Sequence, residues 1–114
     1  MKISEAQKIV KNFAESNGWI DEPNIDKFDH IHEELIEMSQ YLRYKNPEEM
    51  KKIAAEKKDE FEDGIGDLIF SVLRLANQLG VDAEKSFQES AKRITKDYSS
   101  SGKESNLTMK RVRD

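Results

Sequence analysis

Three glutamates stand close together in the segment HEELIEMSQYL, which begins at His32. Glu34 and Glu37 are three positions apart, so in a helix their side chains are neighbours, and Glu33 lies beside them. Carboxylate oxygens are the ligands that Mg²⁺ and Mn²⁺ prefer in proteins. The spacing therefore indicates that Glu34 and Glu37 can share one divalent cation.

A second acidic group follows in the segment EFEDGIGD. Glu60, Asp63 and Asp67 are spaced three and four apart, which places them on a single helix face. Asp67 directly precedes the most apolar stretch of the chain, so its carboxylate is expected at the edge of the core, where a charge needs a partner or an ion. If the two helices pack antiparallel, carboxylates from both form an oxygen-rich cage of the kind that Mg²⁺ binds.

Both acidic groups also have an ordinary explanation. Charged residues make up 37% of the chain, and glutamates at helical spacing usually lie on a solvated face. For either motif alone this explanation is the stronger one, and the combination with Asp67 shifts the balance towards a metal site. Periodicity by itself leaves the choice open.

The residue pattern predicts helices throughout and no strand. A first helix is expected to begin with Ser4 as its N-cap and to end at Asn17–Gly18. A second helix carries one apolar stripe, at spacings of three and four, between Phe28 and Leu42. The highly charged segment 48–64 is also predicted to be helical. Both acidic motifs therefore fall on helices.

The segment 65–79 is apolar on nearly every side. Such a helix must be covered on more than one side, so we expect it to be the central element or to lie at a subunit interface. Gly80 is expected to end it, and Asp82 to cap the last helix. Upstream, Asn46 and Pro47 have the residue types of an N-cap and a first helical position. The expected fold is an all-α bundle of four or five helices.

The totals place limits on the class of protein. A chain of 114 residues forms one small domain, expected over residues 1–98, with residues 99–114 as a flexible basic tail. The net charge of −4 disfavours nucleic acid and anionic membrane as partners. Without cysteine there is no disulfide or thiolate metal site. No apolar segment reaches the length of a signal peptide core or a membrane span, so the expected location is cytoplasmic.

In their order and context, the two motifs resemble the MazG-like nucleotide pyrophosphohydrolases, part of the all-α NTP pyrophosphatase superfamily. EELIEM matches the first half of the family signature, in which two adjacent glutamates are followed after two residues by a third. GDLIFSVLRLAN matches the second half, in which an E-x-x-D pair leads into an apolar helix. The resemblance covers residues 28–98 and implies a helical bundle completed by oligomerisation, as a homodimer or a homotetramer.

The resemblance also implies an activity. Members of the family convert nucleoside triphosphates, with ribose or deoxyribose, to the monophosphates and pyrophosphate by water attack. They require a divalent metal, Mg²⁺ or Mn²⁺. The matching positions imply that Glu34, Glu37 and Asp67 hold the metal and that Glu33 orients or deprotonates the water.

Three further residues are expected, from the resemblance, to bind substrate. Asn77 would contact the nucleoside, although a buried structural hydrogen bond explains an amide on an apolar helix equally well. Arg93 and Lys96 would hold the polyphosphate, with a solvated helix face as the alternative. Trp19 could stack on a base, but such a residue more often belongs to a core or an interface.

One position departs seriously from the family pattern. Gly64 stands where the family has the glutamate of its E-x-x-D pair, and glycine supplies no ligand. Asp63 or Glu60 is expected to take its place, or water to fill the coordination position. Gly64 and Gly66 together also indicate a kink or a close approach between helices.

The missing ligand leaves a second function open. In this alternative the chain is a catalytically weakened helical-bundle protein that binds nucleotide or metal and acts as a regulator. A third possibility is a structural oligomer whose acids are ordinary surface. Thermal stabilisation by metal separates the third possibility from the other two, and turnover separates the first from the second.

Overall fold

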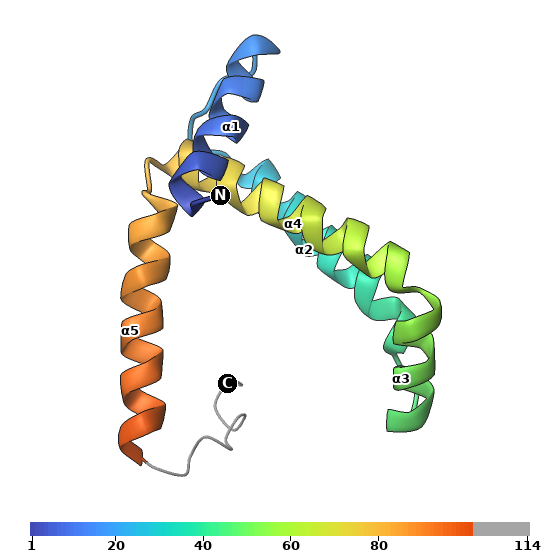
Figure 1. The fold of residues 1–114 in the computed structure, drawn as a ribbon. Helices are drawn as coiled ribbons and strands as arrows, with labels where there is room; N and C mark the ends of the chain where they lie inside the picture. Colours follow the sequence, from blue (N-terminus) through green and yellow to red (C-terminus); the bar gives the residue numbers. More distant parts are fainter. Residues whose placement is uncertain (102–114) are drawn as a thin grey trace.

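The computed structural model describes residues 1–101, with the side chains of residues 1–97, and this part of the chain is all-helical without a strand (Figure 1). Its elements are α1 (Ile3–Ser16), α2 (Ile25–Ser39), the 3₁₀-helix η1 (Gln40–Leu42), α3 (Pro47–Glu56), α4 (Lys58–Leu79) and α5 (Ala83–Ser101). The prediction of an all-α fold is confirmed. Helix α5 runs past residue 98, and the rest of the predicted tail, residues 102–114, lies outside the described residues.

The ends of three helices follow the sequence signals. Asn46 Oδ1 accepts from the amide of Glu49 at 2.8 Å, and a Glu49 carboxylate oxygen accepts from the amide of Asn46 at 2.9 Å, ahead of Pro47 at the start of α3. Gly80 ends α4 in the left-handed conformation, with φ of 69°. Asp82 Oδ1 accepts from the amide of Lys85 in the first turn of α5.

The predicted start of α1 was wrong by a short step. The helix begins at Ile3, with Lys2 as its N-cap residue, and Ser4 lies inside the first turn. A carboxylate oxygen of Glu5 accepts from the Lys2 amide at 2.6 Å. The Ser4 amide donates instead to a carboxylate oxygen of Glu84 at 2.8 Å. Ser4 therefore links α1 to α5 and does not cap its own helix.

Helices α2 and α4 pack against each other in antiparallel directions. Met38 contacts Gly64, and further along, the rings of Tyr41 and Phe61 meet edge to face with centroids 5.6 Å apart. Higher residue numbers on α2 therefore lie beside lower numbers on α4. This direction is the one that the predicted carboxylate cage requires.

The apolar side chains of the single chain are only partly covered. Among the described residues no large side chain is fully buried, and the buried apolar residues are Val10, Ala14, Leu73 and Ala76. Helix α5 diverges from α4 and contacts α1 (Figure 1). Within residues 1–101, no helix is both long and apolar enough to cross a membrane.

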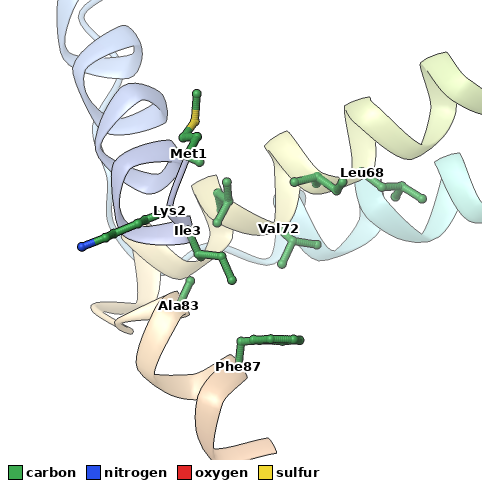
Figure 2. A pocket seen from close by; sticks show the side chains of 10 residues that line it. Met1, Lys2, Ile3, Leu68, Val72, Ala83 and Phe87 are labelled. Carbon is green, nitrogen blue, oxygen red and sulfur yellow. The ribbon is translucent and has the colours of Figure 1, made fainter. Parts of the chain in front are cut away.

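One uncovered apolar region is a trough of about 400 Å³ between the start of α1, the middle of α4 and the start of α5. Figure 2 shows Ile3, Val72 and Phe87 from these three helices around the trough. The full lining is Met1, Lys2, Ile3, Ala6, Leu68, Ile69, Val72, Leu73, Ala83 and Phe87. We call this surface the apolar trough.

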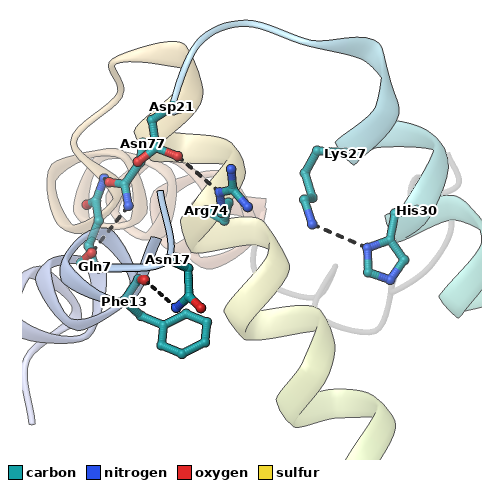
Figure 3. A network of polar contacts seen from close by, with 8 residues as sticks. All are labelled: Gln7, Phe13, Asn17, Asp21, Lys27, His30, Arg74 and Asn77. Carbon is teal, nitrogen blue, oxygen red and sulfur yellow. Dashed lines mark hydrogen bonds and ion pairs between the residues drawn. The ribbon is translucent and has the colours of Figure 1, made fainter. Parts of the chain in front are cut away.

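A network of amide groups fixes α1 to the turn between α4 and α5 (Figure 3). Gln7 Nε2 donates to Asn77 Oδ1 at 2.9 Å and to the carbonyl oxygen of Val81 at 2.8 Å. Gln7 Oε1 accepts from the amide of Ala83 at 2.9 Å, and Asn77 Nδ2 donates back to the Gln7 carbonyl. These bonds hold the first helix across the end of the fourth.

The bond between Ser4 and Glu84 predicts a pH-dependent contribution to stability. The hydrogen bond from the Ser4 amide lowers the pKa of the Glu84 carboxyl, so the stabilisation is present above the ordinary glutamate pKa and is lost as the pH falls. Glu84→Gln is expected to lower the melting temperature at pH 7, with a difference that shrinks towards pH 3. Glu89→Gln, on the same helix, is the matched control; equal effects of both variants would contradict the prediction.

Candidate functional site

The facing sides of α2 and α4 form an acidic groove of about 280 Å³. Two acidic residues of the groove come from α2 and three come from α4. Its full lining is Glu34, Glu37, Met38, Tyr41, Glu60, Asp63, Gly64 and Asp67. The antiparallel packing thus brings carboxylates from both sequence motifs to one surface.

Five of the six acids singled out in the sequence line this groove. Glu33 is the exception, because it is exposed and lies outside the lining residues. Among the described side chains, no three His, Cys, Asp or Glu residues lie close enough together to hold a metal ion. The carboxylates therefore share one groove without forming a ready coordination sphere, and binding an ion requires glutamate side chains to change rotamer.

The donor set suits a hard divalent cation. Every charged group in the groove is a carboxylate, and Tyr41 adds a phenol oxygen. Mg²⁺ and Mn²⁺ bind such oxygen ligands and usually keep several waters, so they do not demand a complete protein cage. Glu34, Glu37 and Asp67 are the residues of this set that the family motif assigns to the metal.

The space beside Gly64 on α4 is filled by a side chain of α2. It is buried, and a Cβ built at this position would collide with the Sδ and Cγ atoms of Met38. The predicted close approach is confirmed at Gly64, whereas a Cβ at Gly66 would meet nothing within 4 Å. The Met38 side chain therefore takes the space that the Cβ of any other residue at position 64 would need.

This difference between the two glycines can be measured. Gly66→Ala is expected to raise the free energy of unfolding by about 1 kcal/mol, because alanine is the better helix former and nothing obstructs it. Gly64→Ala is expected to lower it, and to do so less when Met38→Ala is also present. Denaturant unfolding of the variants measures both effects. A Gly64→Ala protein as stable as Gly66→Ala would contradict the close approach.

A second cavity, of about 260 Å³, adjoins the acidic groove on the side towards the start of α2. Glu34 and Asp67 line both cavities. The remaining lining includes three basic side chains, so we call it the cationic pocket. Its full lining is Trp19, Lys27, His30, Glu34, Asp67, Phe70, Ser71 and Arg74.

Arg74 is held firmly at the wall of the cationic pocket. Its Nε donates to Asp21 Oδ1 at 3.0 Å, and its guanidinium lies over the Trp19 ring, 4.6 Å from the centroid. The side chains of Arg74 and Asp21 are only 13% and 15% exposed, so water screens the pair weakly. Trp19 therefore contacts an arginine, and its ring also meets Phe13 edge to face with centroids 5.4 Å apart, which is closer to the packing role weighed for it than to stacking on a base.

Lys27 and His30 stand on the α2 side of the cationic pocket (Figure 3). Lys27 Nζ lies 3.3 Å from His30 Nδ1, and His30 Nε2 lies 3.8 Å from Glu34 Oε2. Burial lowers the pKa of Lys27, and the positive charge of Arg74 lowers it further. The sequence analysis missed this pocket; its available signal was Arg74, a charged residue inside the most apolar helix.

The three predicted substrate-binding residues lie away from the acidic groove. Asn77 forms the hydrogen bonds with Gln7 that fix α1, which is the structural alternative weighed for it. Arg93 and Lys96 are exposed on α5, which diverges from the α2–α4 pair (Figure 1). Within one chain, neither basic residue lines the acidic groove.

Comparison with curated proteins finds similarity to a bacterial chain. The protein is 28% identical over 103 residues to "Uncharacterized protein YvdC" of Bacillus subtilis (strain 168), an alignment that covers 86% of this chain and 97% of the relative. No family model matches the chain, and no solved structure matches it significantly. The function of the acidic groove is therefore inferred from its own residues and from the motif resemblance.

Proposed function

We propose that the protein is a metal-dependent nucleoside triphosphate pyrophosphohydrolase, which converts NTP or dNTP to the monophosphate and pyrophosphate. The observation that carries the proposal is the acidic groove, where two separate sequence motifs contribute carboxylates to one cavity. Such a donor set suits Mg²⁺ or Mn²⁺. The bound cation would neutralise the phosphates and stabilise the charge that develops in the transition state.

The residues of the groove have distinct proposed roles. Glu34, Glu37 and Asp67 would hold the cation, and Asp63 or Glu60 would serve in place of the ligand missing at Gly64; all five carboxylates line the groove. The proposed base, Glu33, adjoins Glu34 in the chain and is exposed, so water has free access to its carboxylate.

A second copy of the chain completes this proposal. The apolar trough exposes large side chains, including Phe87 with 61% of its surface exposed and Ile69 with 57%. Burying such a patch between identical subunits removes apolar surface from water, and we propose a homodimer or homotetramer formed in this way. Since α5 stands apart from the groove of its own chain, Arg93 and Lys96 would contact substrate held by a neighbouring subunit.

The alternative function also has an observation in its favour. Met38 fills the space beside Gly64, so the groove lacks one carboxylate of the family pattern and has no means of restoring it at that position. A protein with this groove that binds metal or nucleotide without turnover would act as a regulator. Mg²⁺ would then raise the melting temperature while no substrate is consumed.

The test is a turnover assay on the purified protein. A panel of ribo- and deoxyribonucleoside triphosphates is incubated with Mg²⁺ or Mn²⁺, and monophosphate and pyrophosphate are quantified. Release of both products in equal amounts, abolished by chelation of the metal, is the expected result. Absence of turnover on every substrate, together with a metal-dependent rise in melting temperature, would favour the regulatory protein instead.

A further inference from the structure

The cationic pocket holds a lysine with no acidic partner. Among the described side chains, Lys27 forms no ion pair with a carboxylate, and its one polar contact is with His30 Nδ1 at 3.3 Å. We propose that the cationic pocket binds a phosphate group of the substrate, with Lys27 as its direct ligand. This inference rests on the proposed function, because it assigns a binding residue for the same polyphosphate.

The positive charges of Lys27 and Arg74 favour an anion, while Glu34 and Asp67 in the same lining would be offset by the proposed divalent cation. Arg74 is fixed close by through Asp21 and Trp19, and Arg74 lines the pocket whereas its partner Asp21 does not. Burial and the charge of Arg74 both lower the pKa of Lys27, which means that these surroundings disfavour the ammonium form. A phosphate oxygen beside Lys27 Nζ would remove that cost and form a charge-assisted hydrogen bond.

The position of the pocket identifies the kind of anion. Glu34 and Asp67 line both the acidic groove and the cationic pocket, so the two cavities adjoin each other. His30 stands between them, in contact with Lys27 on one side and 3.8 Å from Glu34 on the other. A ligand that fits both cavities has one anionic group held through a divalent cation and another held directly by a lysine. A chain of phosphates has these properties.

The experiment measures the binding of pyrophosphate in the presence of Mg²⁺ by titration calorimetry. Lys27→Met is expected to weaken binding by about tenfold to a hundredfold, the usual effect of losing a hydrogen bond to a charged group. Lys27→Arg should retain most of the affinity, since it keeps the positive charge. Lys51→Met, which removes an exposed lysine on α3, is the matched control and should bind as the wild type does.

Titrations with a nucleoside monophosphate and with inorganic phosphate show which part of the substrate Lys27 contacts. A loss confined to pyrophosphate assigns Lys27 to the leaving group, and a loss confined to the monophosphate assigns it to the phosphate next to the sugar. Equal affinities of wild type and Lys27→Met for all three ligands would overturn the proposal, as would a wild-type protein that binds none of them.

The binding measurements do not depend on whether the protein turns over substrate. Where the wild type turns over substrate, Lys27→Met should raise KM with little change in kcat, because the lost contact is present in both the bound substrate and the transition state. Turnover with an unchanged KM would refute the role of Lys27 and leave the hydrolase proposal standing. Binding that depends on Lys27 in a protein without turnover would refute the hydrolase and support the phosphate pocket.

Discussion

Glu34→Gln is expected to lower kcat/KM for pyrophosphate release by at least about a hundredfold, since the charge stabilisation supplied by a catalytic metal is worth several kcal/mol. Glu34 lines both the acidic groove and the cationic pocket, and its side chain is 25% exposed. The substitution keeps the size of the side chain while it removes a negative charge from the proposed metal site. Steady-state assays with titrated Mg²⁺ measure the effect.

A loss of metal affinity has a separate signature. The rise in melting temperature with Mg²⁺ should become smaller in Glu34→Gln, because fewer carboxylates hold the ion in the native state. Glu56→Gln is the matched control, since Glu56 is exposed on α3 and pairs with Lys52 across one helical turn. Full activity of Glu34→Gln at ordinary Mg²⁺ concentrations would refute the role of the acidic groove in catalysis.

Phe87→Asp is expected to separate the proposed oligomer into single chains. The Phe87 side chain is 61% exposed in the single chain, so a charge there costs little in the monomer itself. In an interface built on the apolar trough, the same charge would lie among apolar groups. The dissociation constant should rise by at least about thirtyfold, the effect typical of a central interface residue.

Light scattering after size-exclusion chromatography measures the assembly directly. Gln88→Asp adds the same charge at the next, exposed position of α5 and should leave the oligomer intact. If Arg93 and Lys96 act on substrate held by a neighbour, Phe87→Asp should also reduce turnover. A wild-type protein that remains monomeric at micromolar concentrations would contradict the proposed assembly.

Helix ends and helix faces could be read from the sequence because they depend on near neighbours. Asn46 and Glu49, which cap α3, are three positions apart, and Gly80 needs only its own backbone freedom to end α4. The acidic faces follow from the same local geometry, since three- and four-residue spacings fix which carboxylates are adjacent. The antiparallel packing of α2 and α4 then brings the two faces together.

The contacts that the sequence did not reveal join residues far apart in the chain. Arg74 and Asp21 are separated by 53 positions, and Gln7 and Asn77 by 70, so no local spacing distinguishes these pairs from others of the same residue types. Asn77 illustrates the consequence: the sequence left a substrate contact and a structural hydrogen bond equally open for it, and the packing of α1 supplies Gln7 as its partner.

By itself, the amino-acid sequence determined the helical class, several helix ends and the faces that carry the acids, because each of these depends on hydrogen bonds and spacings within a few residues. It did not predict the break at Lys57, which separates α3 from α4. Only the tertiary structure decided that Met38 fills the space at Gly64, that α5 stands apart from the groove, and that Lys27 lies near Arg74 with no acidic partner among the described side chains. These features depend on how closely and at what angle helices pack, which is set by side-chain shapes on both partners at once.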